Sequence, residues 1–210
     1  MEGLWDLAQT VYPEDNLAHF FILICYMWAF YGFLHLATHC LCINFNKRYE
    51  KAGRVKQSHY RANIVGPIHA LLSVYFAVLT MFYICGDGKT VFNNDICLNT
   101  PRYLHIWALV NTCGYFLADT FNIVVMIRTF DALDKQMIGH HVIALFTFLG
   151  TTAFMNWCLV FGVMLLFVEV STTYISIRWL IYTHKMHRTA CSTFNAFICF
   201  LTFFLGRLVF

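Results

Sequence analysis

The chain has 210 residues, of which 60% are hydrophobic and only 12% are charged, and its mean hydropathy is +0.62. Soluble domains contain roughly 45–50% apolar residues, so this composition excludes a water-soluble core. The net charge is +3, and no long basic run or basic helix face is present that could follow a phosphate backbone. We therefore expect a membrane protein with no nucleic-acid partner.

Hydropathy predicts apolar helices along most of the chain, because a membrane-crossing helix needs about 20 apolar residues and lipid offers its backbone no other partners. The six runs are Leu17–Phe45, Ile64–Cys85, Tyr103–Ile127, Gly139–Met155, Trp157–Tyr182 and Phe194–Phe210. The fourth is short and almost touches the fifth, so these two should form a tight antiparallel hairpin. The predicted fold class is all-α, a polytopic membrane bundle of about six transmembrane helices.

The charges of the loops predict the orientation of the chain, because Lys and Arg are enriched in short cytoplasmic loops. The first, third and fifth loops together carry ten of these residues, and the amino-terminal tail with the second and fourth loops carries two. Residues 1–16 contain no Lys or Arg, so they lack the basic start of a cleaved signal peptide. We expect residues 1–16 to be a luminal or external tail, followed by one transmembrane domain over residues 17–210.

Two of the nine cysteines lie in the second loop, which this orientation places on the non-cytoplasmic side. Cys85 and Cys97 could form a disulfide there. The residues between them fix no geometry, so a disulfide and two free thiols are both open alternatives.

Polar side chains form stripes on two of the predicted helices. In the third, Asn111, Tyr115 and Asp119 repeat at intervals of four, and Asn122 follows three residues later, so all four share one face. The fifth helix has a similar stripe on one face and its neighbour: Glu169, Ser171, Thr172, Thr173, Ser176 and Arg178. Ionisable groups inside a membrane are costly, so they usually face the bundle interior or a wet cavity and indicate function.

The predicted depth of three of these groups brings them to one level. Asp119 lies about two turns before the cytoplasmic end of the third helix, and His140 and His141 begin the fourth helix from that side. A carboxylate beside an imidazole fixes its tautomer and raises its basicity, as a general base requires. We interpret Asp119, His140, His141 and Glu169 as functional, and the asparagines, serines and threonines as hydrogen-bonding groups between helices.

These residues also carry a resemblance to a known family. The ordered set resembles the TLC superfamily, which includes the ceramide synthases, and consists of Gly114–Asp119, His140–His141, Glu169–Thr172 and Arg178–Trp179. Further segments are more similar to the small TLC-domain-containing proteins: His69–Ser73, Asn195, Thr202–Phe204 and Arg207. The resemblance covers about residues 60–210. The chain departs from it at Thr173, where the small TLC proteins usually have proline.

The resemblance implies a helical barrel around a central cavity that accepts an acyl chain. In ceramide synthases the histidine pair acts in moving an acyl group from acyl-CoA to a sphingoid amine. That role would fall to His140 and His141, with Asp119 as the acidic partner and the other striped residues along the cavity. If the chain is an enzyme, the resemblance implies a lipid acyltransferase with acyl-CoA as substrate and no cofactor, or a role in phospholipid and sphingolipid homeostasis.

Two other interpretations compete with acyl transfer. The first is a membrane di-iron hydroxylase or desaturase, because imidazole suits iron and six histidines fall near the cytoplasmic side: His35, His39, His140, His141, His184 and His187. The H-x-x-H-H boxes of such enzymes are absent. The second is a non-catalytic accessory or lipid-binding subunit among partner membrane subunits. Membrane lipids are the expected ligands, and an endomembrane (endoplasmic reticulum or Golgi) is the expected location, with the mitochondrial inner membrane as the alternative.

Overall fold

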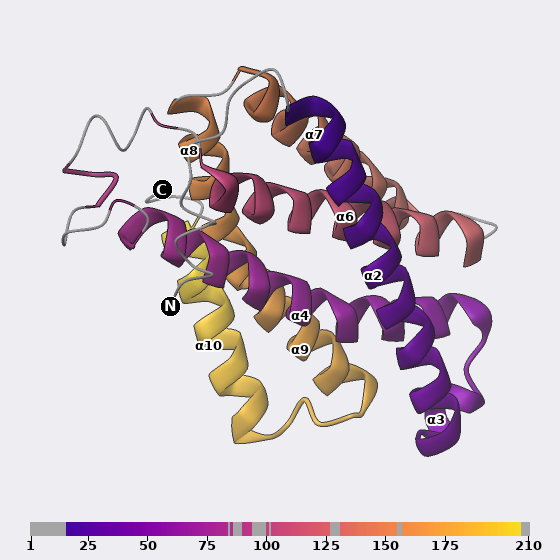
Figure 1. Cartoon of the computed structure of the whole chain (residues 1–210). Coiled ribbons are helices and arrows are strands. Elements are labelled where there is room, and N and C mark those ends of the chain that lie inside the picture. Colours follow the sequence, from indigo (N-terminus) through magenta and orange to yellow (C-terminus); the bar gives the residue numbers. More distant parts are fainter. Residues whose placement is uncertain are drawn as a thin grey trace.

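The computed structural model describes residues 16–83, 85, 90–93, 100, 102–126, 131–154 and 157–206. All the elements in these ranges are helices, as predicted (Figure 1). In chain order they are α2 (Asn16–Phe45), α3 (Lys47–Glu50), α4 (Arg54–Phe82), α6 (Tyr103–Met126), α7 (Ala132–Phe154), α8 (Trp157–Met164), the 3-10 helix η2 (Leu165–Glu169), α9 (Val170–Thr183) and α10 (Ala190–Phe204).

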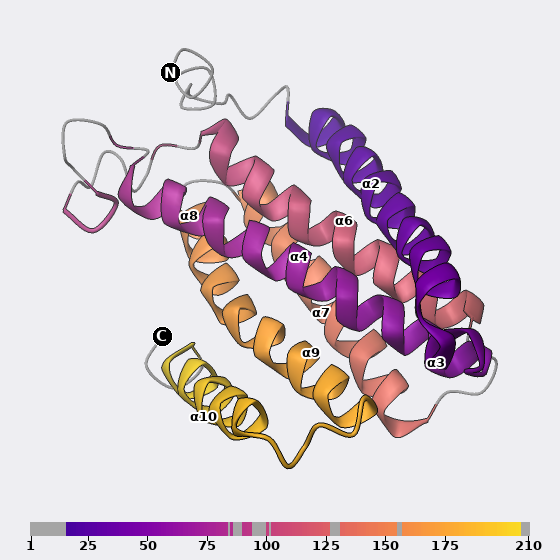
Figure 2. The same cartoon turned by 90° about the horizontal axis from the view of Figure 1, so that it is seen from below.

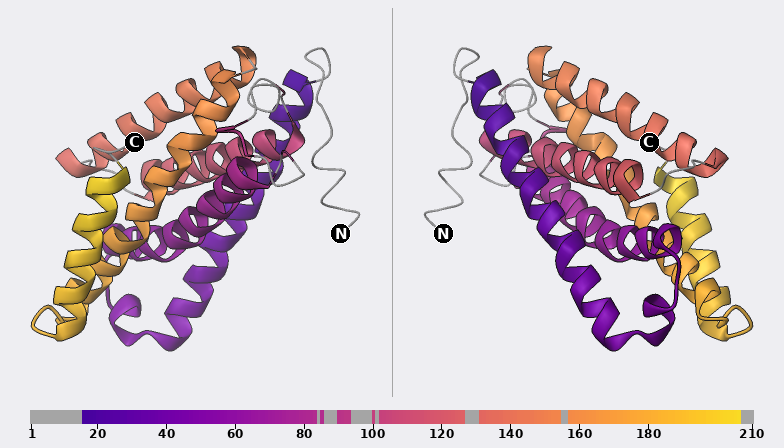
Figure 3. Two further views of the ribbon diagram at one scale, coloured as in Figure 1. Left: turned by 90° about the vertical axis from the view of Figure 1, so that its left-hand side faces the viewer. Right: turned by 90° about the vertical axis from the view of Figure 1, so that its right-hand side faces the viewer.

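Helix α6 forms the centre of the described bundle. It packs against α2, α4, α7 and α8, and Figure 2 shows α2 and α4 on either side of it. Its apolar core residues are Ile106, Ala108, Leu109, Val110, Cys113, Phe116 and Ala118. Helix α10 packs on α9, on the side of the bundle away from α2 (Figure 3). The polar stripe of α6 therefore lies where several helices meet.

Among the described residues, four helical stretches are long and apolar enough to cross a membrane. They are Ala18–Phe45, Arg54–Phe82, Tyr103–Val125 and Val160–Thr183. The chain is thus a multi-pass membrane protein. Helices α7 and α10 correspond to the fourth and sixth predicted runs, but neither is among these stretches, so a total of six spans stays a prediction.

Several predicted runs differ from the helices that contain them. Helix α7 begins at Ala132, seven residues before the expected Gly139, so the fourth run is not a short helix. Helix α4 begins at Arg54, ten residues before the expected Ile64, because its polar first turns continue the helix and bury Ser58, Tyr60 and Arg61 against neighbours. The fifth run is interrupted by the 3-10 turns of η2. Hydropathy marks the part of a helix that contacts lipid, so it detects neither the polar first turns of a helix nor a change to 3-10 geometry.

Local hydrogen bonds explain where two helices begin and end. Before α7, the Asp134 backbone N–H donates to Asp131 Oδ1 at 2.8 Å, and the Asp131 N–H donates to Asp134 Oδ2 at 3.2 Å, which is a reciprocal capping box. After α9, Lys185 has φ 60°, and the N–H groups of Lys185 and Met186 donate to Tyr182 and Ile181. This left-handed turn is a Schellman motif, which ends the helix.

Two glycines mark very close approaches between helices. A Cβ atom at Gly114 of α6 would lie 2.4 Å from Met27 Cβ and 2.9 Å from the Trp28 backbone nitrogen on α2. A Cβ at Gly162 of α8 would lie 2.9 Å from Thr151 Oγ1 on α7. The second contact fits the predicted hairpin of the fourth and fifth runs, since α7 and α8 pack together.

Two expectations fall wholly or partly on residues outside those described. The tail is one of them, because only Asn16 of residues 1–16 is described. Cys85 is disulfide-bonded, but Cys97 lies outside the described residues, so the pairing of these two cysteines stays a prediction.

Candidate functional site

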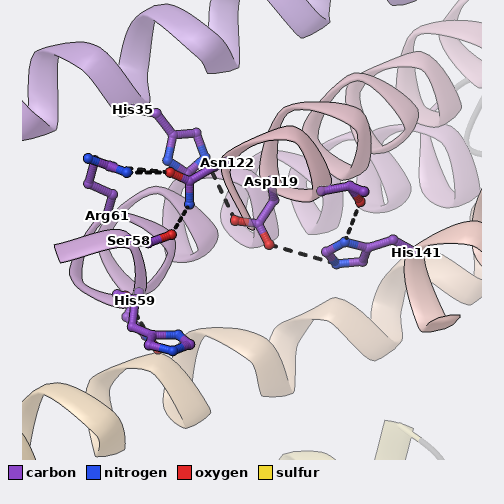
Figure 4. A network of polar contacts seen from close by, with 9 residues as sticks. His35, Ser58, His59, Arg61, Asp119, Asn122 and His141 are labelled. Atoms are coloured by element: carbon purple, nitrogen blue, oxygen red, sulfur yellow. Dashed lines mark hydrogen bonds and ion pairs between the residues drawn. The ribbon is translucent and has the colours of Figure 1, made fainter. Parts of the chain in front are cut away.

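The centre of the candidate site is Asp119, which is only 1% exposed and lies between two imidazoles (Figure 4). Its Oδ2 atom is 4.0 Å from His141 Nε2 on α7, and its Oδ1 atom is 3.8 Å from His35 Nε2 on α2. Helices α2, α6 and α7 thus contribute one acid and two bases. The structure brings together Asp119 and His141, which were expected at the same depth on neighbouring helices.

The imidazole of His141 is held on two further sides. Its Nδ1 atom is 3.1 Å from Thr120 Oγ1, and its ring stacks on Phe116 with centroids 4.7 Å apart. The side chain is 2% exposed. Because both ring nitrogens face polar atoms and the ring face is covered, the orientation of His141 is fixed.

This arrangement suits the transfer of a proton. A carboxylate beside an imidazole stabilises its protonated form and selects one tautomer. Both separations exceed a direct hydrogen bond, and hydrogen bonds of acid–base groups often shorten only when substrate binds. The cluster therefore places one acid within about 4 Å of two bases, without direct hydrogen bonds between them.

The second histidine of the pair lies elsewhere. His140 is exposed and lines a pocket of about 210 Å³ between α6, α7 and η2, together with Glu169 and Phe116. Its ring centroid is 5.8 Å from that of His141. Glu169 also accepts a hydrogen bond from Thr172 at 2.9 Å. The pocket wall therefore combines a base and an acid with apolar side chains.

Asn111, the first residue of the α6 stripe, takes part in a hydrogen-bond network between helices, and Tyr115 makes ring contacts beside it. Asn111 accepts from the Tyr31 hydroxyl at 2.6 Å and donates to Ser73 Oγ at 3.0 Å. Tyr115 stacks on His69 with ring centroids 4.0 Å apart. Asn111 and Tyr115 line neither described pocket, and this network joins α2, α4 and α6 as interhelical hydrogen bonds do.

The predicted residues of α9 separate into two environments. Ser176 is buried near Gly66, and Thr173 Oγ1 is buried without a hydrogen-bond partner among the described residues. Arg178 is exposed and lies 5.2 Å from the centroid of the Tyr182 ring. Neither pocket is lined by any of these three residues.

A second pocket of about 330 Å³ lies on the α2 side of the cluster. Its wall includes His35, Arg61 and Asn122. The two pockets lie on different sides of α6, whose core side chains include Cys113 and Phe116. The single central cavity that the resemblance implies stays a prediction. The position of His35 beside Asp119 was not predicted, although its spacing of four residues from His39 places both histidines on one face of α2.

The described residues contain no group of three or more His, Cys, Asp or Glu side chains that could hold a metal ion. The histidines of the di-iron interpretation have other neighbours. His184, for example, lies 3.4 Å from an Arg48 nitrogen. This part of the chain therefore supplies no di-iron ligand set.

Fold and site together define a multi-pass helical membrane protein with a buried carboxylate–imidazole cluster between two pockets. The family model of the TLC domain matches residues 61–210. The chain belongs to the TLC domain family, which confirms the resemblance and indicates a membrane lipid-related function. No curated protein and no solved structure matches it.

Proposed function

We propose that the protein transfers an acyl group from acyl-CoA to the amine of a membrane lipid. The observation that supports this proposal is the burial of Asp119 between His35 and His141, beside a pocket whose wall carries His140. The acyl chain would occupy this pocket, where Phe116 and Phe148 supply apolar surface. Acyl-CoA would be a substrate, and no cofactor is needed.

The reaction requires one proton to be taken up and returned. The amine nitrogen attacks the thioester carbonyl carbon, so a C–N bond forms, the C–S bond breaks and the coenzyme A thiolate leaves. The histidine pair accepts the amine proton and then passes it to the thiolate. In this pair His140 lies at the pocket, and Asp119 stabilises the protonated form of His141. General acid–base catalysis of this kind contributes about 10²–10⁴-fold to a rate.

The direct test is an assay of purified protein in liposomes with a labelled acyl-CoA and a long-chain amine. We expect an amide product and free coenzyme A from the wild type, and a loss of about 100-fold in His141→Gln and in His140→Gln. The matched control is His59→Gln, because His59 also faces a buried acid, Asp134, at 3.8 Å but lies outside the cluster. Equal product from all variants would contradict acyl transfer at this site.

A second candidate is the non-catalytic accessory or lipid-binding subunit. One observation favours it, because Asp119 and His141 are almost fully buried and line neither described pocket. The cluster would then only hold α2, α6 and α7 together, and the chain would sit among partner membrane subunits. In that case the histidine variants would leave lipid composition unchanged and would lower only the stability of the bundle.

For its location we propose an endomembrane, with the amino terminus on the luminal side. The excess of Lys and Arg in the first, third and fifth loops supports this orientation, and the mitochondrial inner membrane is the alternative. A tag at the amino terminus should resist protease in sealed vesicles. Cleavage of the tag in intact vesicles would show that the amino terminus faces the cytoplasm and would contradict this orientation.

A further inference from the structure

A buried arginine without an acidic partner lies outside the Asp119 cluster. Arg61 is 5% exposed, and it forms no ion pair with a carboxylate of any described residue. Its Nε and Nη2 atoms both donate to Asn122 Oδ1, at 3.1 and 2.6 Å. A guanidinium stays charged at any physiological pH, and a buried charge is costly unless an opposite charge offsets it. The neutral amide of Asn122 does not offset it.

The guanidinium is also held in a fixed orientation (Figure 4). Asn122 donates from Nδ2 to Ser58 Oγ at 2.9 Å, so its carbonyl oxygen is turned towards Arg61. On the other side, Arg61 Nη1 donates to the Tyr49 hydroxyl at 3.5 Å. Burial raises the pKa of Tyr49, and the charge of Arg61 opposes this shift. The protonated hydroxyl can donate to His39 Nδ1, 2.6 Å away. The site is preorganised before any ligand arrives.

The pocket at Arg61 has a polar end and an apolar wall. His35 lines the polar end, is 6% exposed, and has no hydrogen-bond partner on either ring nitrogen among the described residues. The apolar wall consists of Trp28, Leu36, Phe121 and Val125. All four are more than 40% exposed, so the wall faces the surface that contacts lipid. From His39 to Trp28 this wall extends about 16 Å along α2.

We propose that this pocket binds an anionic membrane lipid, whose phosphate group pairs with Arg61 and whose acyl chain lies along the wall at Trp28 and Phe121. Guanidinium and phosphate form paired, charge-assisted hydrogen bonds. Arg61 lies in the first turns of α4, beside α3 and the loop that joins α2 to α4. From this position near the end of the span we place it at the level of the lipid headgroups. A volume of about 330 Å³ holds the headgroup and the start of one chain, while the rest stays in the bilayer. This site does not depend on the proposed acyl transfer.

The test is a titration of the detergent-solubilised full chain by native mass spectrometry with phosphatidic acid, phosphatidylcholine and inorganic phosphate. We expect phosphatidic acid to bind at least about tenfold more tightly than phosphatidylcholine, which corresponds to one additional charge interaction. Arg61→Gln should abolish this preference. Gly32→Leu should weaken binding of phosphatidic acid, because Gly32 lies on the pocket wall and a side chain there would narrow the pocket. A Cβ at Gly32 meets nothing within 4 Å, so the substitution should not clash with the protein.

The matched control is Arg48→Gln, since Arg48 is an exposed cation at the same end of the bundle. It should keep the preference of the wild type. Equal binding of the two lipids by the wild type would overturn the proposal, as would an unchanged preference in Arg61→Gln. Competition by inorganic phosphate at equal concentration would show a free-anion site in place of a lipid site. If Arg61→Gln does not fold, unchanged binding to Gly32→Leu would overturn the proposal.

Discussion

Replacing Asp119 by asparagine should lower the rate of acyl transfer by about 100-fold or more, the largest effect that we expect from a single substitution. Asparagine has the same shape, but its amide carries no negative charge beside His35 and His141. The protonated imidazole that forms during the reaction would then lose its stabilising partner. The measurement is the initial rate of amide formation in liposomes, with the amount of folded protein matched by size-exclusion chromatography.

Asp134→Asn is the control for this substitution. Asp134 is 3% exposed and faces His59 at 3.8 Å, so it matches Asp119 in burial and in having an imidazole neighbour. It lies in the capping box of α7, away from the Asp119 cluster. We expect Asp134→Asn to retain most of the activity. A similar loss in both variants would mean that the effect of Asp119→Asn reflects stability alone.

Substitution of Gly114 by alanine should lower the free energy of unfolding by about 2 kcal/mol. The added methyl group would lie 2.4 Å from Met27 Cβ and 2.8 Å from the Met27 carbonyl carbon, so α2 and α6 must separate. Overpacking of this kind costs about 1–3 kcal/mol, and contact with backbone favours the upper end. Alanine recovers up to about 1 kcal/mol through its helix propensity, which offsets only part of the loss.

Gly139→Ala is the control for this substitution, and we expect it to leave the free energy of unfolding unchanged or to raise it. A Cβ at Gly139 of α7 meets nothing within 4 Å, so only the gain in helix propensity remains. Equilibrium unfolding in mixed micelles should therefore show Gly114→Ala less stable than the wild type and Gly139→Ala as stable or more stable. Equal free energies of unfolding in the two variants would contradict the close approach of α2 and α6.

The fold class and one contact of the site could be predicted from the sequence. Apolar runs define helices whatever their neighbours are, and the depth of Asp119 and His141 follows from counting residues along antiparallel helices. Membership of the TLC domain family over residues 61–210 supports the fold class. The structure accordingly places these two side chains together.

The partners from α2 and from the start of α4 could not be predicted in the same way. Helix α2 carries apolar residues on all sides, so its sequence does not indicate which face turns towards Asp119, and His35 was considered only as a metal ligand. Arg61 was counted among the loop charges because hydropathy begins the second run at Ile64, whereas α4 begins at Arg54. Tertiary packing decides both positions.

The 3-10 helix η2 has a geometric effect on the fifth apolar run. A 3-10 helix turns about 120° per residue, compared with about 100° in an α-helix. Over the five residues Leu165–Glu169 the side-chain directions therefore advance by about 100° more than a continuous α-helix would give. Helix α4 packs against both halves of this run, while α8 also presents Gly162 to α7 and α9 also packs against α10. A single helical wheel drawn through Trp157–Tyr182 would therefore misplace the side-chain directions of α9 by about 100° relative to those of α8.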